Sequence, residues 1–373
     1  MALKAITLTT GIFPPDIGGP ASFIPLLAQK LYEKGIDVEV ITLADDTKSI
    51  LNYPYKVTRI PRYVKKPWRD FSVIKAIFVA AKKSDLIFSN TLAFESAIAA
   101  KLSGKKLIQK VVGDIAWERA YSSERFLGTL DEYQKAPLSL VSKLTNVYRN
   151  RGVFGSSLII TPSMYLKKIV QGWGFSKDKI EVVYNAVPLK KSTEIIPKET
   201  FRIISVGRLI PHKGFEGIIK ALAKLDFTFE YIVIGEGFLK EKLLHLAQEL
   251  GIKIKFLGVL SQSQVAIWLR SSDVFILNSS YEGLPHVVLE AMMNDCPIIA
   301  SAVGGTVELV RDEDNGLLFH YNDIEMLVDK IYTIKNDCLL RKKLQDNATL
   351  FARTFSSVEE MVDHYIEIFE KEL

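Results

Sequence analysis

Two glutamates with seven residues between them, Glu282 and Glu290, flank the segment of this chain whose residue types could best do chemistry. The apolar run 272–278 before them is typical of a buried strand, and the residues after Glu290 continue a helical pattern. We expect a loop that carries Glu282 and then a helix with Pro285 in its first turn, where the missing N–H has no cost. The free amides of such a turn can bind phosphate, and carboxylates accept hydrogen bonds from hydroxyl groups. A nucleoside diphosphate sugar offers both groups, although the spacing alone also fits a loop charge and a solvated helix residue.

Two cations follow another apolar run. Residues 203–207 read as a buried strand that ends in glycine, and the next loop carries Arg208 and Lys213. Arg208 can present a planar fork to phosphate oxygens, while Lys213 acts as a point charge. A third strand at 231–234 ends in the Gly-Glu-Gly sequence 235–237. Because ligands of open α/β sheets bind outside the carboxyl ends of the strands, we expect these loops to border one site.

Further short motifs occur in a fixed order along nearly the whole chain. They are Pro14 to Gly19, Asn185 to Val187, Gly207-Arg208 with Lys213-Gly214, Gly235 to Gly237, Glu282 to Met292, and Gly304 to Thr306 with Glu308. With them the chain resembles the GT-B glycosyltransferases, and specifically the retaining family called glycosyltransferase family 4. The glutamate motif with the arginine–lysine pair is specific, whereas each glycine motif is weak by itself. The resemblance implies an α/β protein with two Rossmann-like domains that face each other across a cleft, and a C-terminal helix that crosses back to the N-terminal domain.

The rest of the chain agrees with two domains. Strand-like and helix-like runs alternate through 373 residues, 48% of them hydrophobic, which predicts parallel sheets covered by helices. We expect an N-terminal Rossmann-like domain at 1–187, a C-terminal one at 198–353 and a closing helix at 354–373 that packs back on the first. The resemblance assigns the acceptor to the first domain and the nucleotide sugar to the second. The polar stretch 189–194 reads as a linker, and we expect one of the first domain's helices at 135–149.

Two loops of the first domain could also reach the ligand. Gly18 and Gly19 precede a helix whose first turn faces the site, and by resemblance this loop closes over the diphosphate and the acceptor. Asp114 stands where related enzymes place a polar residue near the transferred sugar, and Trp117 could stack on a sugar face. Arg119 completes the predicted acceptor-binding group. The alternatives are an ordinary turn at the two glycines, a helix cap at Asp114 and a core position for Trp117.

These considerations give three groups of predicted site residues. The groups that would stabilise the leaving diphosphate and the transferred sugar are Arg208, Lys213, Glu282 and Asp114. Those expected to contact the donor are Gly18, Gly19, Gly207, Gly235, Gly237, Val259, Gly283, Leu284, Pro285, His286, Val287, Val288 and Glu290. Those expected to contact the acceptor are Trp117 and Arg119.

We expect neither a cofactor nor a metal ion. The run Asp312 to Asp314 matches the metal-binding signature of the other glycosyltransferase fold, but Asn315-Gly316 follows it and predicts a solvated turn. All 5 histidines lie in the second half of the chain. An inverting enzyme of this architecture usually needs a general base from the first domain, so this distribution weakly favours retention. In retaining relatives the departing phosphate takes the acceptor's proton.

Charge is unevenly distributed. Residues 1–186 hold 27 Lys and Arg against 16 Asp and Glu, so the first half should meet an anionic partner. Cations alternate with aromatic residues in 59–69, and the predicted helix 138–151 adds further cations. Both segments suit an anionic membrane or a lipid diphosphate. Solvated loops and ordinary core packing are the alternative explanation. No nucleic-acid-binding motif accompanies this charge.

The run 5–9 is too short for a signal peptide and no stretch reaches the ~18 apolar residues of a membrane span, so we expect a cytoplasmic protein, with attachment to the inner face of the membrane as a further option.

The leading hypothesis is therefore a retaining, metal-independent hexosyltransferase of surface polysaccharide synthesis. It would move a sugar from a nucleotide donor, UDP-linked rather than GDP-linked, to a hydroxyl of a glycan or a lipid-linked glycan. Two alternatives share the architecture: a nucleotide-sugar epimerase, and a non-catalytic subunit that binds a nucleotide sugar for a partner.

Overall fold

The computed structural model describes residues 1–16, 18–47, 52–186, 191–355 and 357–373. It divides into two compact units. Unit 1 takes in residues 1–127 and 131–186 with the C-terminal segment, and unit 2 takes in 128–130 and 187–355. The predicted domain boundary at Val187 lies outside the described residues.

Unit 1 contains a seven-stranded sheet of order β3-β2-β1-β4-β5-β6-β7, in which every neighbouring pair is parallel. Its strands are β1 (Ala5–Thr10), β2 (Asp37–Ala44), β3 (Lys56–Pro61), β4 (Leu86–Ser89), β5 (Leu107–Lys110), β6 (Leu158–Thr161) and β7 (Ile180–Val182). Its helices are α1 (Gly19–Glu33), α2 (Trp68–Ala81), α3 (Ala93–Ser103), α4 (Ile115–Ser122), α5 (Leu130–Lys135), α6 (Leu140–Val153), α7 (Met164–Gly172) and α15 (Val358–Glu372).

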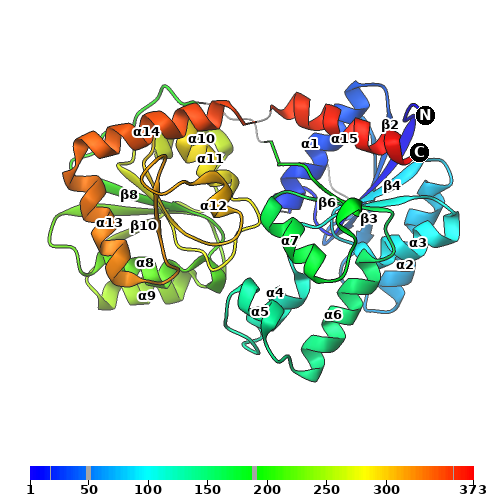
Figure 1. Ribbon diagram of the computed structural model, residues 1–373, viewed down its shortest axis with the longest axis horizontal. Helices are drawn as coiled ribbons and strands as arrows, with labels where there is room; N and C mark the ends of the chain where they lie inside the picture. The colour runs from blue at the N-terminus through cyan, green and yellow to red at the C-terminus, as the bar shows by residue number, and fades with distance from the viewer. Residues whose placement is uncertain (17, 48–51, 187–190, 356) are drawn as a thin grey trace. The chain divides into compact units, whose positions relative to one another are not determined.

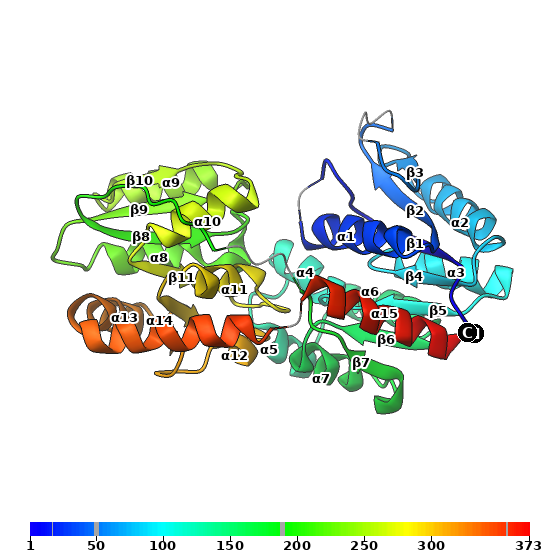
Figure 2. The ribbon, with the colours of Figure 1, turned by 90° about the horizontal axis from the view of Figure 1, so that it is seen from above.

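Alternate residues of these strands enter two different hydrophobic clusters, as expected of a parallel sheet that is buried on both faces. Leu8 and Phe88, which face each other across β1 and β4, join the cluster formed with α1 and α15. Ile87, one residue away, joins the cluster formed with α2 and α3. Figures 1 and 2 show α1 beside α15, and Figure 2 shows α2 beside α3.

The closing helix α15 packs on unit 1. Ser357 and Glu360 form a capping box at its start, and the buried residues recur at helical spacing as far as Phe369. The ring of Tyr365 lies 5.6 Å from that of Phe23 on α1, centroid to centroid. This confirms the predicted return of the last helix to the first unit; residue 356 of the predicted helix lies outside the described residues.

Unit 2 contains a six-stranded parallel sheet of order β10-β9-β8-β11-β12-β13. Its strands are β8 (Phe201–Val206), β9 (Phe229–Ile234), β10 (Ile254–Phe256), β11 (Val274–Leu277), β12 (Ile298–Ser301) and β13 (Leu317–Phe319). Its helices are α8 (Phe215–Leu222), α9 (Lys240–Glu249), α10 (Gln262–Arg270), α11 (His286–Met293), α12 (Thr306–Leu309), α13 (Ile324–Asn336) and α14 (Cys338–Arg353). The chain runs outward from β8 in one direction and from β11 in the other, so a topological switch point lies between these two strands.

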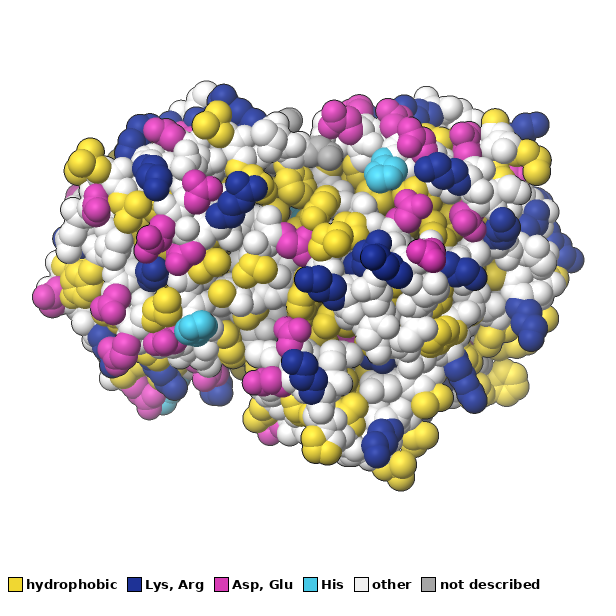
Figure 3. Space-filling view, in the orientation of Figure 1, with side chains coloured by type: hydrophobic (Ala, Val, Ile, Leu, Met, Phe, Trp, Pro, Cys, Tyr) yellow, Lys and Arg dark blue, Asp and Glu magenta, His cyan; other side chains and the backbone are white. Residues whose placement is uncertain are grey.

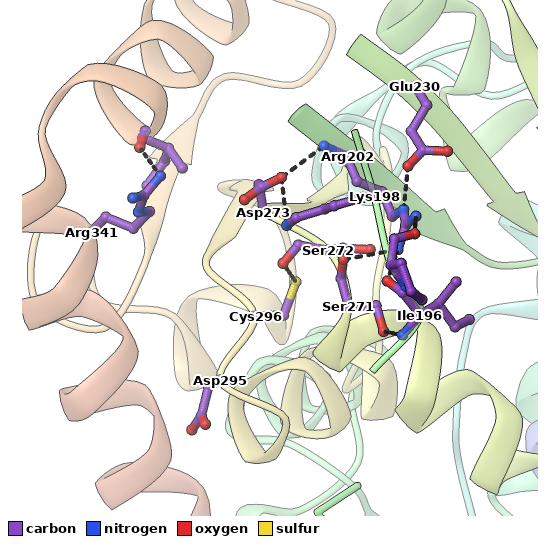
Figure 4. A network of polar contacts seen from close by, with 12 residues as sticks. Ile196, Lys198, Arg202, Glu230, Ser271, Ser272, Asp273, Asp295, Cys296 and Arg341 are labelled. Carbon is purple, nitrogen blue, oxygen red and sulfur yellow. Dashed lines mark hydrogen bonds and ion pairs between the residues drawn. The ribbon is translucent and has the colours of Figure 1, made fainter. Parts of the chain in front are cut away.

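The residues that lead into β8 are bound to unit 2 by a buried arginine (Figure 4). Arg202 is 2% exposed and donates hydrogen bonds to the carbonyl oxygens of Ile196 (3.0 Å) and Pro197 (2.8 Å). Lys198 forms an ion pair with Asp273 at 2.7 Å. Residues 189 and 190 of the predicted linker lie outside the described residues. The described remainder is attached to unit 2, because Lys191 pairs with Asp295 at 2.7 Å and the amide of Ser192 donates to Oδ1 of Asn294 at 2.8 Å.

The structure corrects three local predictions. Residues 136–139 are not helical, because Pro137 disfavours a helix in the preceding residue and the side chain of Ser139 caps α6 by accepting a hydrogen bond from the amide of Ser142. The basic segment 59–69 begins inside β3 and is not wholly a loop. Pro285 precedes α11 in an extended conformation instead of lying in its first turn. In the described part of the chain, no helix has both the length and the apolar character needed to cross a bilayer.

Candidate functional site

The carboxyl edge of the unit 2 sheet brings the predicted glycine loops into direct contact. A Cβ on Gly235 would lie 2.0 Å from the carbonyl oxygen of Gly207, and a Cβ on Gly237 would lie 2.3 Å from that of Leu209. No side chain fits at such distances, so the backbones after β8 and β9 pack against each other. The amide of Gly235 also donates to the carbonyl of Gly258 at 2.8 Å, which adds the loop after β10.

The loop after β8 packs equally closely on the loop after β11, across the switch point. Gly214 has a φ of +62°, and a Cβ there would lie 1.9 Å from the carbonyl oxygen of Asn278. Ser280 donates its amide hydrogen to the carbonyl of His212 at 2.8 Å. These contacts fix the position of Lys213, which stands between His212 and Gly214.

Lys213 and Glu282 form an ion pair, with 2.6 Å between Nζ and Oε1. The hydroxyl of Ser279 donates to the same carboxylate oxygen, also at 2.6 Å. The side chains of Lys213 and Glu282 are 18% and 9% exposed, so the pair is largely withdrawn from water but can be reached by a ligand. The amide of Gly305 donates to the carbonyl of Glu282, and a Cβ on Gly304 would lie 2.3 Å from that carbonyl oxygen. Three loops therefore hold Glu282.

A second cation accompanies this pair. Arg208 is exposed, and among the described residues its guanidinium has no carboxylate partner. Burial, followed by the charges of Lys213 and Arg208, lowers the pKa of His212 to about 3. His212 is therefore neutral at pH 7, and the positive charge at this edge belongs to Arg208 and Lys213.

The turn that follows Glu282 leads into α11. The amide of Val288 donates to the carbonyl of Pro285 at 3.0 Å, so it is already used within the turn. In the part of the chain that the structure describes, the amides of Gly283 and Leu284 have no hydrogen-bond partner. Two backbone donors thus remain available beside Glu282, as an anion-binding turn requires.

Glu290 lies further along α11 and faces α10. Its Oε1 accepts a hydrogen bond from Nε2 of Gln262 at 3.0 Å. Burial raises the pKa of Glu290, and the bond from Gln262 acts in the opposite direction. Val259, three residues before Gln262, is 52% exposed. The predicted donor residues of unit 2 therefore follow one edge of its sheet.

In unit 1, Gly18 and Gly19 lie at the start of α1, and Ile17 before them is outside the described residues. Arg62 fixes the preceding loop through an ion pair with Asp16 at 2.6 Å. Arg59 donates to the carbonyl of Pro14 at 3.2 Å. Two of the cations predicted to meet an anionic partner are therefore used to hold this loop.

In the structure Asp114 is a helix cap and Trp117 is a core residue, as the alternative interpretations of these two residues predicted. Asp114 is fully buried and caps α4 by accepting hydrogen bonds from the amides of Ala116 (2.9 Å) and Trp117 (3.3 Å). Its other oxygen pairs with the buried guanidinium of Arg149. Trp117 is also fully buried, so its ring has no face open to a sugar in this structure. Arg119 lies on the outer side of the same helix.

Arg119 lines a cavity of about 330 Å³ in unit 1 that the sequence did not predict. Glu95, Gln109 and Tyr148 also line it, from α3, β5 and α6. Oε1 of Gln109 is buried there, and it has no hydrogen-bond partner within the described part of the chain. Burial, together with the charges of Glu95 and Asp70, raises the pKa of Tyr148 to about 12, so its hydroxyl stays protonated and can donate a hydrogen bond. The sequence feature that could have indicated this cavity is the polar pair Gln109 and Lys110 at the end of the otherwise apolar strand β5.

The acidic run Asp312 to Asp314 forms the predicted turn. Asp312 and Gly316 form a bridge, and Oδ1 of Asp312 accepts from the amide of Leu318 at 2.7 Å. Among the described residues, no group of three or more His, Cys, Asp or Glu is placed to hold a metal ion.

Two known families together match residues 17–351 of the chain. Residues 17–191 match the family described as Glycosyltransferase Family 4, and residues 188–351 match the family described as Glycosyl transferases group 1.

Two named glycosyltransferases match part of the chain. The lipopolysaccharide core biosynthesis glycosyltransferase LpsD of Rhizobium meliloti is 30% identical over 220 residues, which cover 57% of this chain and 62% of LpsD. The N-acetylgalactosamine-N,N'-diacetylbacillosaminyl-diphospho-undecaprenol 4-alpha-N-acetylgalactosaminyltransferase of Campylobacter jejuni is 30% identical over 199 residues, or 52% of this chain and 54% of that one. The chain therefore spans less than two thirds of the length of either relative.

Among solved structures, sucrose-phosphate synthase from Thermosynechococcus elongatus is similar with a TM-score of 0.81. The two are 18% identical, and the likeness covers 99% of this chain and 98% of that one. It shows that the two proteins share a fold.

Proposed function

The chain belongs to the family 4, or group 1, glycosyltransferases of the GT-B fold, and from this premise we propose that it transfers a sugar from a nucleotide diphosphate sugar to a hydroxyl group of a glycan. We favour a UDP-sugar over a GDP-sugar. Unit 2 binds the donor and unit 1 binds the acceptor in this proposal.

The observation that carries the proposal is the Lys213–Glu282 pair together with Arg208, whose guanidinium has no carboxylate partner among the residues that the structure describes. A diphosphate needs cations and N–H donors, which Arg208, Lys213 and the amides of Gly283 and Leu284 supply. A sugar needs hydrogen-bond acceptors for its hydroxyl groups, which Glu282 and Glu290 supply. Both sets of groups belong to loops at one edge of one sheet.

The proposed reaction retains the configuration of the anomeric carbon. The bond between that carbon and the phosphate oxygen breaks, the acceptor oxygen bonds to the carbon on the same face, and the acceptor's proton passes to the departing phosphate. Arg208 and Lys213 stabilise the negative charge that develops on the phosphate, which is the main electrostatic contribution. These two side chains carry that role without a metal ion, and no protein nucleophile takes part.

The relatives' names support an acceptor of surface-glycan synthesis. LpsD is named for lipopolysaccharide core synthesis, and the Campylobacter enzyme for a sugar on diphospho-undecaprenol. We propose that the acceptor here is likewise a glycan or a lipid-linked glycan. The cavity of unit 1 supports a site for it, because Glu95, Gln109 and Tyr148 place a carboxylate, an amide and a hydroxyl group on its wall.

The test is incubation with a panel of UDP- and GDP-sugars, each with and without a lipid-linked glycan acceptor. Mass spectrometry and NMR then identify the products and the anomeric configuration. We expect an α-linked product from an α-linked donor, formed only when acceptor is present and at an unchanged rate in EDTA. Formation of an isomeric nucleotide sugar without acceptor would show an epimerase instead. A Glu282→Gln variant that keeps full biological activity would show a subunit that only binds.

A further inference from the structure

A cavity of about 520 Å³ lies in unit 2 beside α14. Four basic side chains line it against two acidic ones; they are Lys191, Arg270, Lys342 and Arg353, with Asp295 and Asp346. Figure 3 shows Lys and Arg side chains beside Asp and Glu on the part of unit 2 where Figure 1 places α14. Residues 187–373 as a whole carry 21 Lys and Arg against 27 Asp and Glu. A basic cavity in this acidic half of the chain is therefore not a consequence of overall charge.

This cavity is separate from the predicted donor loops. Arg270 lies shortly before β11 and Asp295 shortly before β12, at the amino ends of these strands. Glu282 and Gly304 follow the same two strands, at their carboxyl ends. Because the strands are parallel, their amino ends share one edge of the sheet and their carboxyl ends share the other. The cavity therefore lies at the edge opposite the proposed donor site.

Asp295 is the residue around which the cations gather. Its Oδ2 lies 2.7 Å from Nζ of Lys191 and also pairs with the guanidinium of Arg270. Its Oδ1 lies 2.9 Å from the hydroxyl of Thr349 on α14. Both carboxylate oxygens are thus engaged, and the two cations exceed the single negative charge.

A third cation adds to this excess. Arg353 lies one turn beyond Thr349 on α14; it is exposed, and no carboxylate in the described ranges pairs with it. Nε of Arg270 is buried and has no hydrogen-bond partner in the part of the chain that the structure describes. We call Lys191, Arg270 and Arg353 the α14 cluster; with Asp295 it carries an excess of about two positive charges at pH 7. Lys342 pairs with Asp346 at 2.6 Å and adds no net charge.

Helix ends explain part of this arrangement. Arg270 and Arg353 are the last residues of α10 and α14, where the carbonyl groups at the end of a helix favour a cation. That effect accounts for each arginine by itself. It does not account for three cations on the wall of one cavity around a single carboxylate.

A phosphate group matches the α14 cluster. An arginine fork binds two phosphate oxygens at once, and a lysine acts as a point charge beside it. A phosphate monoester carries about 1.5 to 2 negative charges at pH 7, close to the excess of the cluster. Gln345 and Leu350 line the cavity too, and they can contact the rest of a small phosphorylated molecule.

We propose that the α14 cluster binds the phosphate group of a small phosphorylated molecule. The ligand joins the two ends of the main segment of unit 2, because Lys191 stands near the beginning of 187–355 and Arg353 near its end. Binding therefore stabilises unit 2 against unfolding. This site is additional to the donor site and does not rest on the proposed function.

Titration calorimetry with inorganic pyrophosphate tests the site, on the full chain with excess UDP present to fill the proposed donor site. We expect one pyrophosphate per chain, bound more weakly as salt is added. Arg353→Gln should weaken binding about tenfold to a hundredfold, the usual loss for one charge-assisted hydrogen bond. The matched control Lys343→Gln removes an exposed lysine of the same helix that does not line the cavity, and it should bind as wild type.

Thermal unfolding separates a lost ligand contact from a damaged fold. Without ligand, Arg353→Gln should unfold at the wild-type temperature, because Arg353 has no ion pair within the described residues to lose. Pyrophosphate should then raise the unfolding temperature of wild type more than that of the variant. No heat with wild type, or equal affinity in wild type and Arg353→Gln, would overturn the proposal. An equal loss in Lys343→Gln would overturn it as well, because the effect would then be one of general charge.

Lys213→Met distinguishes this site from the proposed donor site. Under the same conditions it should bind pyrophosphate as wild type. Loss of binding in Lys213→Met, with Arg353→Gln unaffected, would show that the pyrophosphate occupies the donor edge and would remove this inference alone. Failure of UDP and GDP to bind, with pyrophosphate still bound through Arg353, would remove the proposed function alone.

Discussion

At the scale of single residues, we propose that the Lys213–Glu282 ion pair serves ligand binding more than stability. Removing two charges from water is costly, and a buried pair often contributes no more to folding than apolar residues of similar size. Glu282 is nevertheless held by Ser279 and by the amide of Gly305, so its position is fixed before any ligand arrives. Such preorganisation is what a group that must stabilise a transition state requires.

The raised pKa of Glu290 leads to a prediction about how the stability of the protein depends on pH. Burial raises its pKa in the folded protein, so the folded state favours the protonated carboxyl relative to the unfolded chain. Its stabilising contribution is therefore fully present below the ordinary value of 4.5 and is lost as the pH rises through the folded pKa. At pH 7 the buried, ionised carboxylate lowers the stability of the folded protein. Glu290→Gln should accordingly raise the unfolding temperature at pH 7 and have little effect below pH 4.5.

Scanning calorimetry at the two pH values measures this, with Glu241→Gln as the control because Glu241 is exposed in the first turn of α9. A Glu290→Gln variant that is less stable than wild type at pH 7 would show that the carboxylate is needed for folding. The expected gain in stability, combined with loss of activity, would instead mark a residue retained for its ligand.

At the scale of elements, close backbone contacts hold the β8 and β11 loops together, and Gly214 tests this. Gly214 and Gly251 both have positive φ values, +62° and +69°. A Cβ would lie 1.9 Å from the carbonyl oxygen of Asn278 at the first position and would meet nothing within 4 Å at the second. Gly251→Ala should cost about 1–2 kcal/mol for the left-handed conformation alone, and Gly214→Ala should cost several times more.

Urea denaturation of the two variants gives the comparison. Equal losses of stability would mean that the loops separate without penalty and that their contact does not position Lys213. A larger loss in Gly214→Ala would confirm that the backbone packing around this glycine supports the site.

The sequence predicted those elements whose own residues determine them. Apolar runs identified strands such as β8 and β11, because central strands of a parallel sheet are buried on both faces. β3 was not recognised, because it is an edge strand of mixed composition with only Ile60 fully buried. The start of α6 was placed too early, since the effects of Pro137 and the Ser139 cap are stronger than the helical pattern around them.

At the scale of the whole molecule, the predicted fold class is confirmed: two α/β units, each with a parallel sheet, and a last helix that returns to unit 1. The grouping of the predicted unit 2 residues could be anticipated because they follow successive strands, and the carboxyl ends of parallel strands share one edge. The surroundings of Asp114 could not be predicted, because it forms an ion pair with Arg149, which lies 35 residues away in the chain. The cavity of unit 1 could not be predicted either, since α3, β5 and α6 each contribute only one or two of its polar residues.

The excess of positive charge in the first half of the chain divides between two uses. Arg59 and Arg62 hold the loop before α1, and Arg149 is buried against Asp114. Lys65, Lys143 and Arg151 are exposed at the surface of unit 1. Net charge alone therefore did not distinguish structural cations from those that can meet a partner.

The central claim is that the carboxyl edge of the unit 2 sheet binds a nucleoside diphosphate, and titration calorimetry with UDP and GDP tests it most directly. We expect wild-type protein to bind at least one of the two nucleotides. Lys213→Met should weaken that binding about tenfold to a hundredfold, the usual loss for one charge-assisted hydrogen bond. Lys220→Met, which removes an exposed lysine of the adjacent helix α8, should bind as wild type. No heat with either nucleotide, or equal affinity in wild type and Lys213→Met, would contradict the account.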